Sequence, residues 1–201
     1  GSPHIVGRQW THVGLIAGGT GIAPLFQLAK ILLEEDEKTT TTTPKKKTSI
    51  HILSINRKQE DILLKEELDQ LAQEYPDRVH VTYSLTDPTI GSTANHKGGD
   101  DHKEWTGWTG RGSIDMVRAA LPPPHHHHPS VTTIPHEEGD PKSSSTTMIF
   151  VCGTDGFVET WGGPIGRAPP LANGKKGPKI QGPLVGLLKE AGYDESEVFK
   201  Y

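Results

Sequence analysis

Three glycines surround a hydroxyl side chain in the segment VGLIAGGTGIAP, which spans residues 13–24. Gly18 and Gly19 precede Thr20, and Gly21 follows it. Two interpretations of this pattern are open. The first is a tight turn, because glycine adopts positive φ at little steric cost. The second is phosphate binding, because bare glycine backbone at a helix N-terminus lets an anion reach unpaired N–H groups, to which Thr20 adds a hydroxyl donor.

A loop of this kind must be positioned by a strand before it and a helix after it. Residues 11–17 have the apolar character of a short buried strand, and residues 24–35 have the apolar spacing of a helix that Pro24 opens. Further strands are predicted at 49–56, 78–85, 147–153 and 197–201, and further helices at 60–74, 113–121 and 182–193. This alternation predicts an α/β fold with an open parallel sheet of about five strands, covered by helices on both faces, as in Rossmann-like nucleotide-binding domains.

The predicted topology places two candidate segments at one edge of the sheet. In open parallel sheets, ligands bind beyond the carboxyl ends of the strands. The glycine loop follows the first strand, and Cys152 and Gly153 end the fourth. We therefore expect both segments to meet at the same edge, which favours phosphate binding over a purely structural turn.

Composition limits the alternatives. The chain has 201 residues, a net charge of −4, 23 glycines and 16 prolines, which predicts a single domain with much loop. Low-complexity insertions are expected near 38–47, 87–110, 122–146 and 162–181. The mild acidity gives no indication of nucleic-acid binding. The longest apolar runs are too short for a transmembrane helix. The single cysteine excludes an internal disulfide.

Five sequence blocks resemble a known family when they are taken together. They are VGLIAGGTGIAPLFQLAKILLEE, NRKQEDILLKEELDQLAQEYPDRVHVTYSL, GRGSIDMVRAALPPP, IFVCG and EVFKY, in this order. They resemble the nicotinamide-binding half of NADH–cytochrome b5 reductases, within the ferredoxin–NADP reductase superfamily, while the insertions do not match. The tail QGPLVGLLKEAGYDESEVFKY resembles a fungal mitochondrial branch that is associated with cytochrome c haem attachment.

The resemblance implies an oxidoreductase that passes a hydride from NADH to FAD and then single electrons to a haem protein. The family carries FAD on a separate N-terminal barrel with an Arg-x-Tyr-Ser motif, which this sequence lacks. We therefore expect a nucleotide-binding fragment that is inactive alone, with any membrane attachment through regions outside it. The implied location is mitochondrial, with the cytoplasm as the alternative, and NADPH stays open as the coenzyme.

The resemblance also assigns the phosphate and adenosine contacts. The phosphate loop matches Gly18, Gly19, Thr20 and Gly21, with Pro24 opening its helix, and the adenosine side matches Asn56 and Arg57. An equally good interpretation of Arg57 is a solvated charge beside Glu60 or Asp61. In the family, an acidic residue after the third strand favours NADH by repelling a 2′-phosphate. Thr86 occupies the aligned position and Asp87 comes next, which leads us to expect NADH.

The nicotinamide end is assigned in the same way. Cys152 and Gly153 match a Cys-Gly pair beside the nicotinamide, followed here by Thr154. On composition alone Cys152 is a small buried residue, whereas the resemblance implies that it positions the nicotinamide and is not a nucleophile. Phe199 and Tyr201 match the terminal aromatic region near the flavin, and an equally good interpretation is that they complete the core or the chain end.

Two other interpretations were weighed against the reductase. The residues after Gly153 depart from the family pattern, so the chain could be a non-catalytic interaction module that binds a mitochondrial partner through its insertions. A flavodoxin-like protein is less favoured, because no hydroxyl-rich loop follows the first strand. The tract of histidines at 125–128 is interpreted as a surface segment and not as a metal site, since metal ligands in folds are spaced and held by neighbouring groups.

Overall fold

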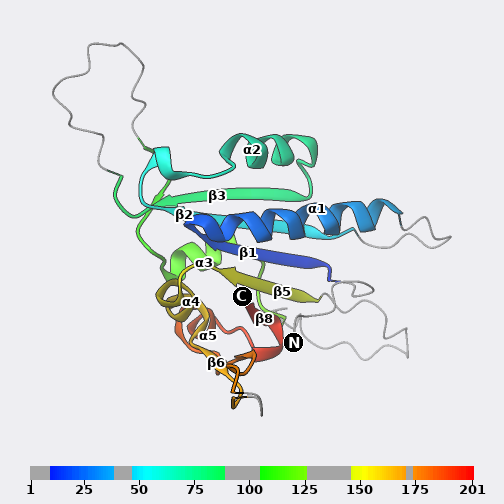
Figure 1. Cartoon of the computed structure of the whole chain (residues 1–201). Coiled ribbons are helices and arrows are strands. Elements are labelled where there is room, and N and C mark those ends of the chain that lie inside the picture. Colours follow the sequence, from blue (N-terminus) through cyan, green and yellow to red (C-terminus); the bar gives the residue numbers. More distant parts are fainter. Residues whose placement is uncertain (1–9, 39–46, 89–104, 126–145, 171–173) are drawn as a thin grey trace, which may run out of the picture.

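The computed structural model describes residues 10–38, 47–88, 105–125, 146–170 and 174–201, and its centre is a six-stranded sheet with helices on both faces (Figure 1). The strands of this sheet are β1 (His12–Gly18), β2 (Ser49–Asn56), β3 (Val79–Leu85), β4 (Trp108–Thr109), β5 (Thr147–Cys152) and β8 (Val198–Lys200). The helices are α1 (Ile22–Lys38), α2 (Lys65–Glu74), α3 (Ile114–Ala120), α4 (Asp155–Gly162) and α5 (Gly186–Glu190), with 3₁₀ turns η1 (Gly19–Gly21), η2 (Gln59–Asp61) and η3 (Glu195–Glu197). Within these described residues, every helix is too short or too polar to cross a membrane.

The strand order of the sheet is β4-β3-β2-β1-β5-β8, and all neighbouring strands are parallel. The chain moves outward from β1 through β2 and β3, and then returns to the opposite side of β1 to form β5. The order of the strands therefore reverses between β1 and β5. In open parallel sheets this reversal leaves a crevice in which ligands bind.

Two apolar cores hold the layers together, one on each face of the sheet. Helices α1 and α2 pack on the first face and α3, α4 and α5 on the second. Strand β1 contributes Leu15 and Ala17 to the first core and Ile16 to the second, because successive side chains of a strand point to opposite faces. Burial on both faces explains why this strand is apolar throughout.

The predicted α/β fold is confirmed, and several boundaries differ from the expected ones. Helix α1 begins at Ile22, two residues before the expected start, so Pro24 lies inside the first turn, where a missing N–H costs no hydrogen bond. Strand β2 has the predicted bounds. Ser113 is the N-cap of α3, since its Oγ accepts a hydrogen bond from the Met116 backbone N–H at 3.1 Å.

The continuous helix expected at 60–74 is wrong. It is divided into η2 and α2, because Leu64 adopts a left-handed conformation with φ of 55°. The break leaves Leu63 45% exposed instead of inside the core. Asp61 caps η2, because its carboxylate accepts a hydrogen bond from the Lys58 backbone N–H at 3.1 Å.

Some regular structure lies where the sequence indicated loops. Strand β4 pairs with the end of β3 and makes the sheet six strands wide instead of about five. Helix α4 begins directly after Thr154, in the segment that departs from the family pattern. The last helix is shorter than expected: it begins at Gly186, which has φ of 76° and follows the extended residue Val185, and it ends at Glu190.

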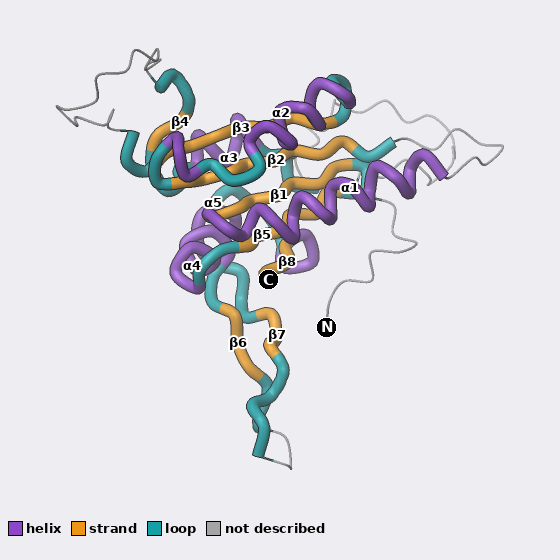
Figure 2. The backbone as a smooth tube through the Cα atoms, turned by 45° about the horizontal axis from the view of Figure 1, so that its top comes forward, coloured by secondary structure: helices purple, strands orange, loops and turns teal. Residues whose placement is uncertain are grey.

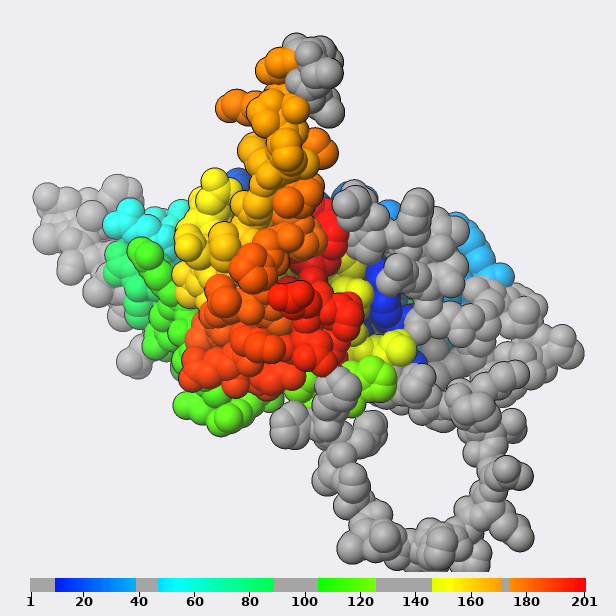
Figure 3. Space-filling view, turned by 90° about the horizontal axis from the view of Figure 1, so that it is seen from below, coloured from blue at the N-terminus to red at the C-terminus, as the bar shows by residue number. Residues whose placement is uncertain are grey.

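The insertion at 162–181 contains an antiparallel hairpin of β6 (Ile165–Arg167) and β7 (Lys179–Gln181), which projects away from the main sheet (Figures 2 and 3). Its base is held by the buried side chain of Lys200 in β8. The Lys200 ammonium lies 2.8–3.1 Å from four backbone carbonyl oxygens, those of Gly162, Pro164, Gly182 and Pro183, which share its three N–H donors. Both ends of the hairpin are therefore attached to one lysine.

Candidate functional site

The glycine loop lies at the carboxyl end of β1, at the reversal of strand order. Gly19 has φ of +53°, and a Cβ built on it meets no atom within 4 Å, so this side of the loop is open. Thr20 is exposed beside it. The turn leads directly into α1, whose first N–H groups and dipole favour an anion at this end. The loop therefore has the space and the polarity that a phosphate requires.

Gly21 has a second role that the sequence did not indicate. It is buried, and a Cβ built on it would lie 2.2 Å from the carbonyl oxygen of Cys152 and 2.9 Å from the Gly153 nitrogen. The backbone of the glycine loop thus packs against the backbone that ends β5. Only glycine permits this contact without moving one of the two loops.

Phe157 supports both loops from the second face of the sheet. A Cβ on Gly18 would lie 2.8 Å from its ring, and a Cβ on Gly153 would lie 2.6 Å from it. Phe157 lies on α4, a helix absent from the predicted elements. The apolar spacing of Phe157, Val158 and Trp161 is the signal that could have revealed this helix.

Cys152 is half-buried at the end of β5, where its side chain packs against the first core. Burial raises the pKa of the Cys152 thiol, and the nearby Lys179 acts in the opposite direction. A thiol with a raised pKa is protonated at neutral pH and is a poor nucleophile. Its chemistry therefore fits a positioning role better than covalent catalysis.

Thr154 and α4 complete this side of the crevice. Thr154 is the exposed N-cap of α4, and the first turn of that helix holds Asp155. The N-termini of α1 and α4 thus follow directly from β1 and β5, the two strands that flank the reversal. Two helix starts therefore lie at the edge of the sheet where the strand order reverses.

The predicted adenosine residues lie together on the other side of β1. The backbone N–H of Thr86 donates to the Asn56 carbonyl at 2.9 Å, and that of Asp87 donates to the Arg57 carbonyl at 2.8 Å. The Arg57 side chain is 72% exposed, and its Nε lies 3.7 Å from the Asp87 carboxylate. Arg57 is thus solvated as the alternative interpretation expected, but beside Asp87 instead of Glu60 or Asp61. The Asn56 side chain is buried, and its amide donates to the Ser54 hydroxyl at 3.0 Å.

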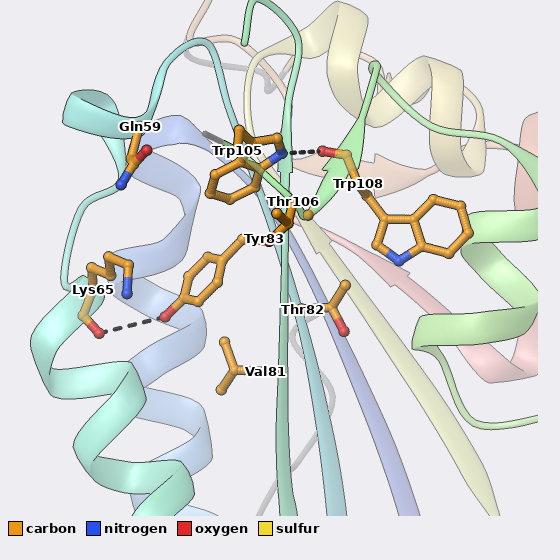
Figure 4. Close-up of a pocket in the computed structure, with 9 residues that line it drawn as sticks. Gln59, Lys65, Val81, Thr82, Tyr83, Trp105, Thr106 and Trp108 are labelled. Atoms are coloured by element: carbon orange, nitrogen blue, oxygen red, sulfur yellow. Dashed lines mark hydrogen bonds between the residues drawn. The ribbon is translucent and has the colours of Figure 1, made fainter. Parts of the chain in front are cut away.

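A hollow of about 420 Å³ lies at the outer edge of β3, beside Val81, Thr82 and Tyr83. Figure 4 shows Trp105, Tyr83 and Lys65 around it. Trp105 donates a hydrogen bond from Nε1 to the Trp108 carbonyl at 2.9 Å, which fixes its ring. The Tyr83 hydroxyl donates to the Asp69 carboxylate at 2.7 Å. The hollow has aromatic walls on which a planar ring can stack, while the Lys65 ammonium beside it is paired with Asp69 and lies 5.2 Å from the centre of the Tyr83 ring.

The terminal aromatic residues lie on the β8 side of the crevice. Phe199 is paired with Phe150, two residues before the end of β5, and the two ring centroids are 6.0 Å apart. Tyr201 lies nearer to the crevice, because its backbone N–H donates to the Val151 carbonyl at 3.0 Å. Its ring meets Phe199 edge-on at 5.2 Å. Tyr201 is therefore better placed than Phe199 to touch a ligand beside Cys152.

The structure thus gathers most of the predicted site residues in one place. The loop at 18–21 contacts the turn at 152–154, and residues 56–57 and 86–87 follow on the next two strands. Phe199 lies deeper in the sheet. Within the described part of the chain, no cluster of histidine, cysteine, aspartate or glutamate could hold a metal ion. The histidines at 126–128 lie outside the described residues.

Comparisons of sequence match this chain to known oxidoreductases. Residues 15–161 match the oxidoreductase NAD-binding domain family. NADH-cytochrome b5 reductase 2 of Aspergillus terreus is 33% identical over 190 residues, which are 94% of this chain and 44% of the relative. NADH-cytochrome b5 reductase 2 of Saccharomyces cerevisiae is 31% identical over 194 residues, 96% of this chain and 48% of the relative. The chain spans about half the length of these relatives.

Solved structures show the same fold. The cytochrome b5 reductase domain of Ulva prolifera nitrate reductase superposes with a TM-score of 0.56 at 22% identity, covering 96% of this chain and 51% of that one. The CS-b5R domains of human Ncb5or, in the NAD+ form, superpose with a TM-score of 0.56 at 16% identity, covering 96% of this chain and 37% of that one.

Proposed function

Since the chain belongs to the oxidoreductase NAD-binding domain family of ferredoxin–NADP reductases, we propose that it holds NADH for hydride transfer to an FAD carried elsewhere in the whole protein. The observation that supports this most is the contact between the glycine loop and the Cys152–Gly153 turn at the reversal of strand order. The electrons would then pass to a haem protein of the cytochrome b5 type. A mitochondrial location is part of the same proposal.

In this proposal the diphosphate of the coenzyme lies against the loop of Gly19 and Thr20. Gly19 leaves the backbone uncovered, and Thr20 offers a hydroxyl donor. The dipole of the 17-residue helix α1 places partial positive charge at this point. The residues present therefore fit an anionic group, and no lysine or arginine is needed for the contact.

The nicotinamide end lies by Cys152, Gly153 and Thr154. The redox chemistry is that of the coenzyme, and the protein contributes position. Gly153 lets the Phe157 ring pack directly against the backbone of this turn, and the protonated Cys152 thiol offers a soft, uncharged contact. Tyr201 limits the space from the β8 side. None of these side chains needs to accept or release a proton during hydride transfer.

The adenosine end lies along the carboxyl ends of β2 and β3. The hollow beside Trp105 and Tyr83 accepts the adenine, and Asp87 accepts hydrogen bonds from the adenosine ribose. Strand β3 lies two strands from β1, about 10 Å away, so an extended dinucleotide can reach from the glycine loop to the hollow.

A second function is favoured by one observation, the attachment of the 162–183 segment to Lys200. An insertion that is held at both ends is organised to present a surface. A non-catalytic module that uses this surface without binding nucleotide would show partner binding and no response to NADH.

Titrating the isotope-labelled chain with NADH is expected to shift the amide resonances of residues 18–22 and 152–154 and the indole N–H resonance of Trp105. The reason is that phosphate, nicotinamide and adenine would lie at these three places. Nuclear magnetic resonance spectra recorded up to millimolar NADH measure the effect. Unchanged spectra at that concentration would contradict the proposed function.

A matched pair of glycine variants tests the phosphate contact in the same titration. Gly19→Ala should weaken NADH binding about tenfold, because the methyl group covers the backbone that a phosphate approaches. Gly174→Ala is the control, since Gly174 also has positive φ, at 74°, and open space around it, but lies on the hairpin. Both variants should lose about 1 kcal/mol of folding stability through backbone strain. Equal NADH affinity in the two would place the phosphate elsewhere.

Asp87→Asn should raise the ratio of NADPH affinity to NADH affinity about tenfold, because it removes a negative charge that repels a 2′-phosphate and leaves Arg57 free to pair with it. Isothermal titration with both coenzymes measures the ratio. Glu60→Gln is the control, because Glu60 is an exposed carboxylate that pairs with Lys58. If the parent protein, Asp87→Asn and Glu60→Gln all gave the same ratio, Asp87 would not belong to the adenosine site.

A further inference from the structure

The β6–β7 hairpin carries only positive charge. Residues 163–182 include Arg167, Lys175, Lys176 and Lys179 and contain no aspartate or glutamate. All four basic side chains are exposed. The whole chain has a net charge of −4, so subtracting these four positive charges leaves −8 on the remainder. The hairpin, which projects from the main sheet (Figures 2 and 3), is thus basic, whereas the rest of the chain is acidic.

Two of these charges are placed directly opposite each other. Arg167 and Lys179 are cross-strand partners in the β6–β7 ladder. Like charges in this position destabilise a strand pair. Asp155 and Glu159 line a hollow of about 240 Å³ with them, but in the described part of the chain neither cation has a carboxylate within ion-pair distance. Within the described residues no close ion pair therefore compensates this repulsion, and a negative group from a partner would do so.

The base of the hairpin is held in a defined place beside the candidate site. Gln181 accepts a hydrogen bond from the Lys200 backbone N–H at 2.8 Å and donates one to the Lys200 carbonyl at 2.8 Å. Lys200 is paired in the sheet with Val151, the residue before Cys152. The four contacts of the Lys200 ammonium fix both ends of the segment. A partner on the hairpin would therefore lie next to the nicotinamide end of the crevice.

We propose that the β6–β7 hairpin docks an acidic surface of the haem protein that accepts the electrons. The inference rests on the proposed function, which requires an electron acceptor near this crevice. A globular protein with a local acidic patch fits better than an anionic membrane or a nucleic acid. An extended polyanion would also meet the acidic body, whereas a local patch can contact the hairpin alone.

The test uses the labelled chain and the acidic haem domain of a cytochrome b5 at low ionic strength. Binding should shift resonances of residues 165–167 and 175–181, and added salt should weaken it. Lys175→Gln combined with Lys176→Gln should raise the dissociation constant about fivefold. Lys30→Gln combined with Lys189→Gln removes the same charge from exposed helix positions and should leave the constant unchanged.

Three results would overturn the proposal. They are equal loss of affinity in both double variants, shifts confined to residues outside the hairpin, or tighter binding to phosphatidylserine vesicles or duplex DNA than to the haem domain. The NADH titration keeps this proposal separate from the proposed function. A chain that binds NADH but not the haem domain would refute the docking surface alone, and a chain that binds the haem domain but not NADH would refute the coenzyme site.

Discussion

Gly21→Ala is expected to destabilise the fold by about 3 kcal/mol, since it forces a methyl group into backbone that cannot rotate away. The added Cβ would lie 2.2 Å from the Cys152 carbonyl oxygen and 2.5 Å from its carbonyl carbon. These atoms belong to β5, a central strand, so the glycine loop or the end of β5 must move. Urea unfolding followed by circular dichroism measures the loss.

The control for this prediction is Gly156→Ala, in the first turn of α4. A Cβ there meets no atom within 4 Å, and the residue is helical. Alanine should therefore stabilise the protein by about 0.5 kcal/mol by restricting the unfolded chain. If the Gly21 variant unfolded at the same urea concentration as the parent protein, the loops would not be in contact.

Gly21→Ala should also weaken NADH binding beyond detection, even in the molecules that remain folded. Separating the loop from β5 by the width of a methyl group disturbs the phosphate contact and the nicotinamide contact together. Gly19→Ala alters only the phosphate side. A Gly21 variant that was destabilised but bound NADH as tightly as the parent would show that the site tolerates this movement.

Lys200→Met is expected to cost about 3 kcal/mol of stability and to release the hairpin. Methionine keeps the length of the side chain but has no donor for the four carbonyls that the ammonium satisfies. Buried acceptors without donors are costly. Hydrogen exchange should accelerate at residues 179–182, at the β7 end of the segment, while the exchange of β1 and β2 amides remains tied to global unfolding.

Lys189→Met serves as the matched control, because Lys189 is an exposed lysine on α5. Its stability should stay within about 0.5 kcal/mol of the parent. Lys200→Arg keeps the charge and several donors, so it should retain part of the attachment. Unchanged exchange at residues 179–182 in Lys200→Met would mean that the hairpin is held by its own ladder and by Gln181.

The elements that were predicted correctly have strong local signals. Strand β2 alternates and is rich in β-branched residues, and its bounds were as expected. The apolar pattern after Ser113 predicted α3, which Ser113 caps. Other elements were missed for identifiable reasons. Two glycines obscure the apolar spacing of α4, and β4 is only two residues long, so it exists only through its pairing with β3.

Part of the candidate site could also be predicted from the sequence. The alternation of strands and helices implied that the loop after β1 and the turn after β5 share one edge, and the structure brings them into contact. The sequence did not predict that Phe157 packs under both loops or that Arg57 pairs with Asp87. Both depend on which side chains from separate segments meet, and the hydrophobic pattern does not encode this.

By itself, the sequence determined the layered fold and the edge of the sheet that carries the glycine loop, because periodicity and the rules for parallel strands act along short segments. Only the tertiary structure decided that Gly21 must lack a side chain, that Leu64 breaks a helix and that Lys200 joins both ends of the hairpin. In the first and last cases the deciding atoms come from strands and loops far apart in the chain. In the case of Leu64, packing of the whole domain outweighs a local preference for helix.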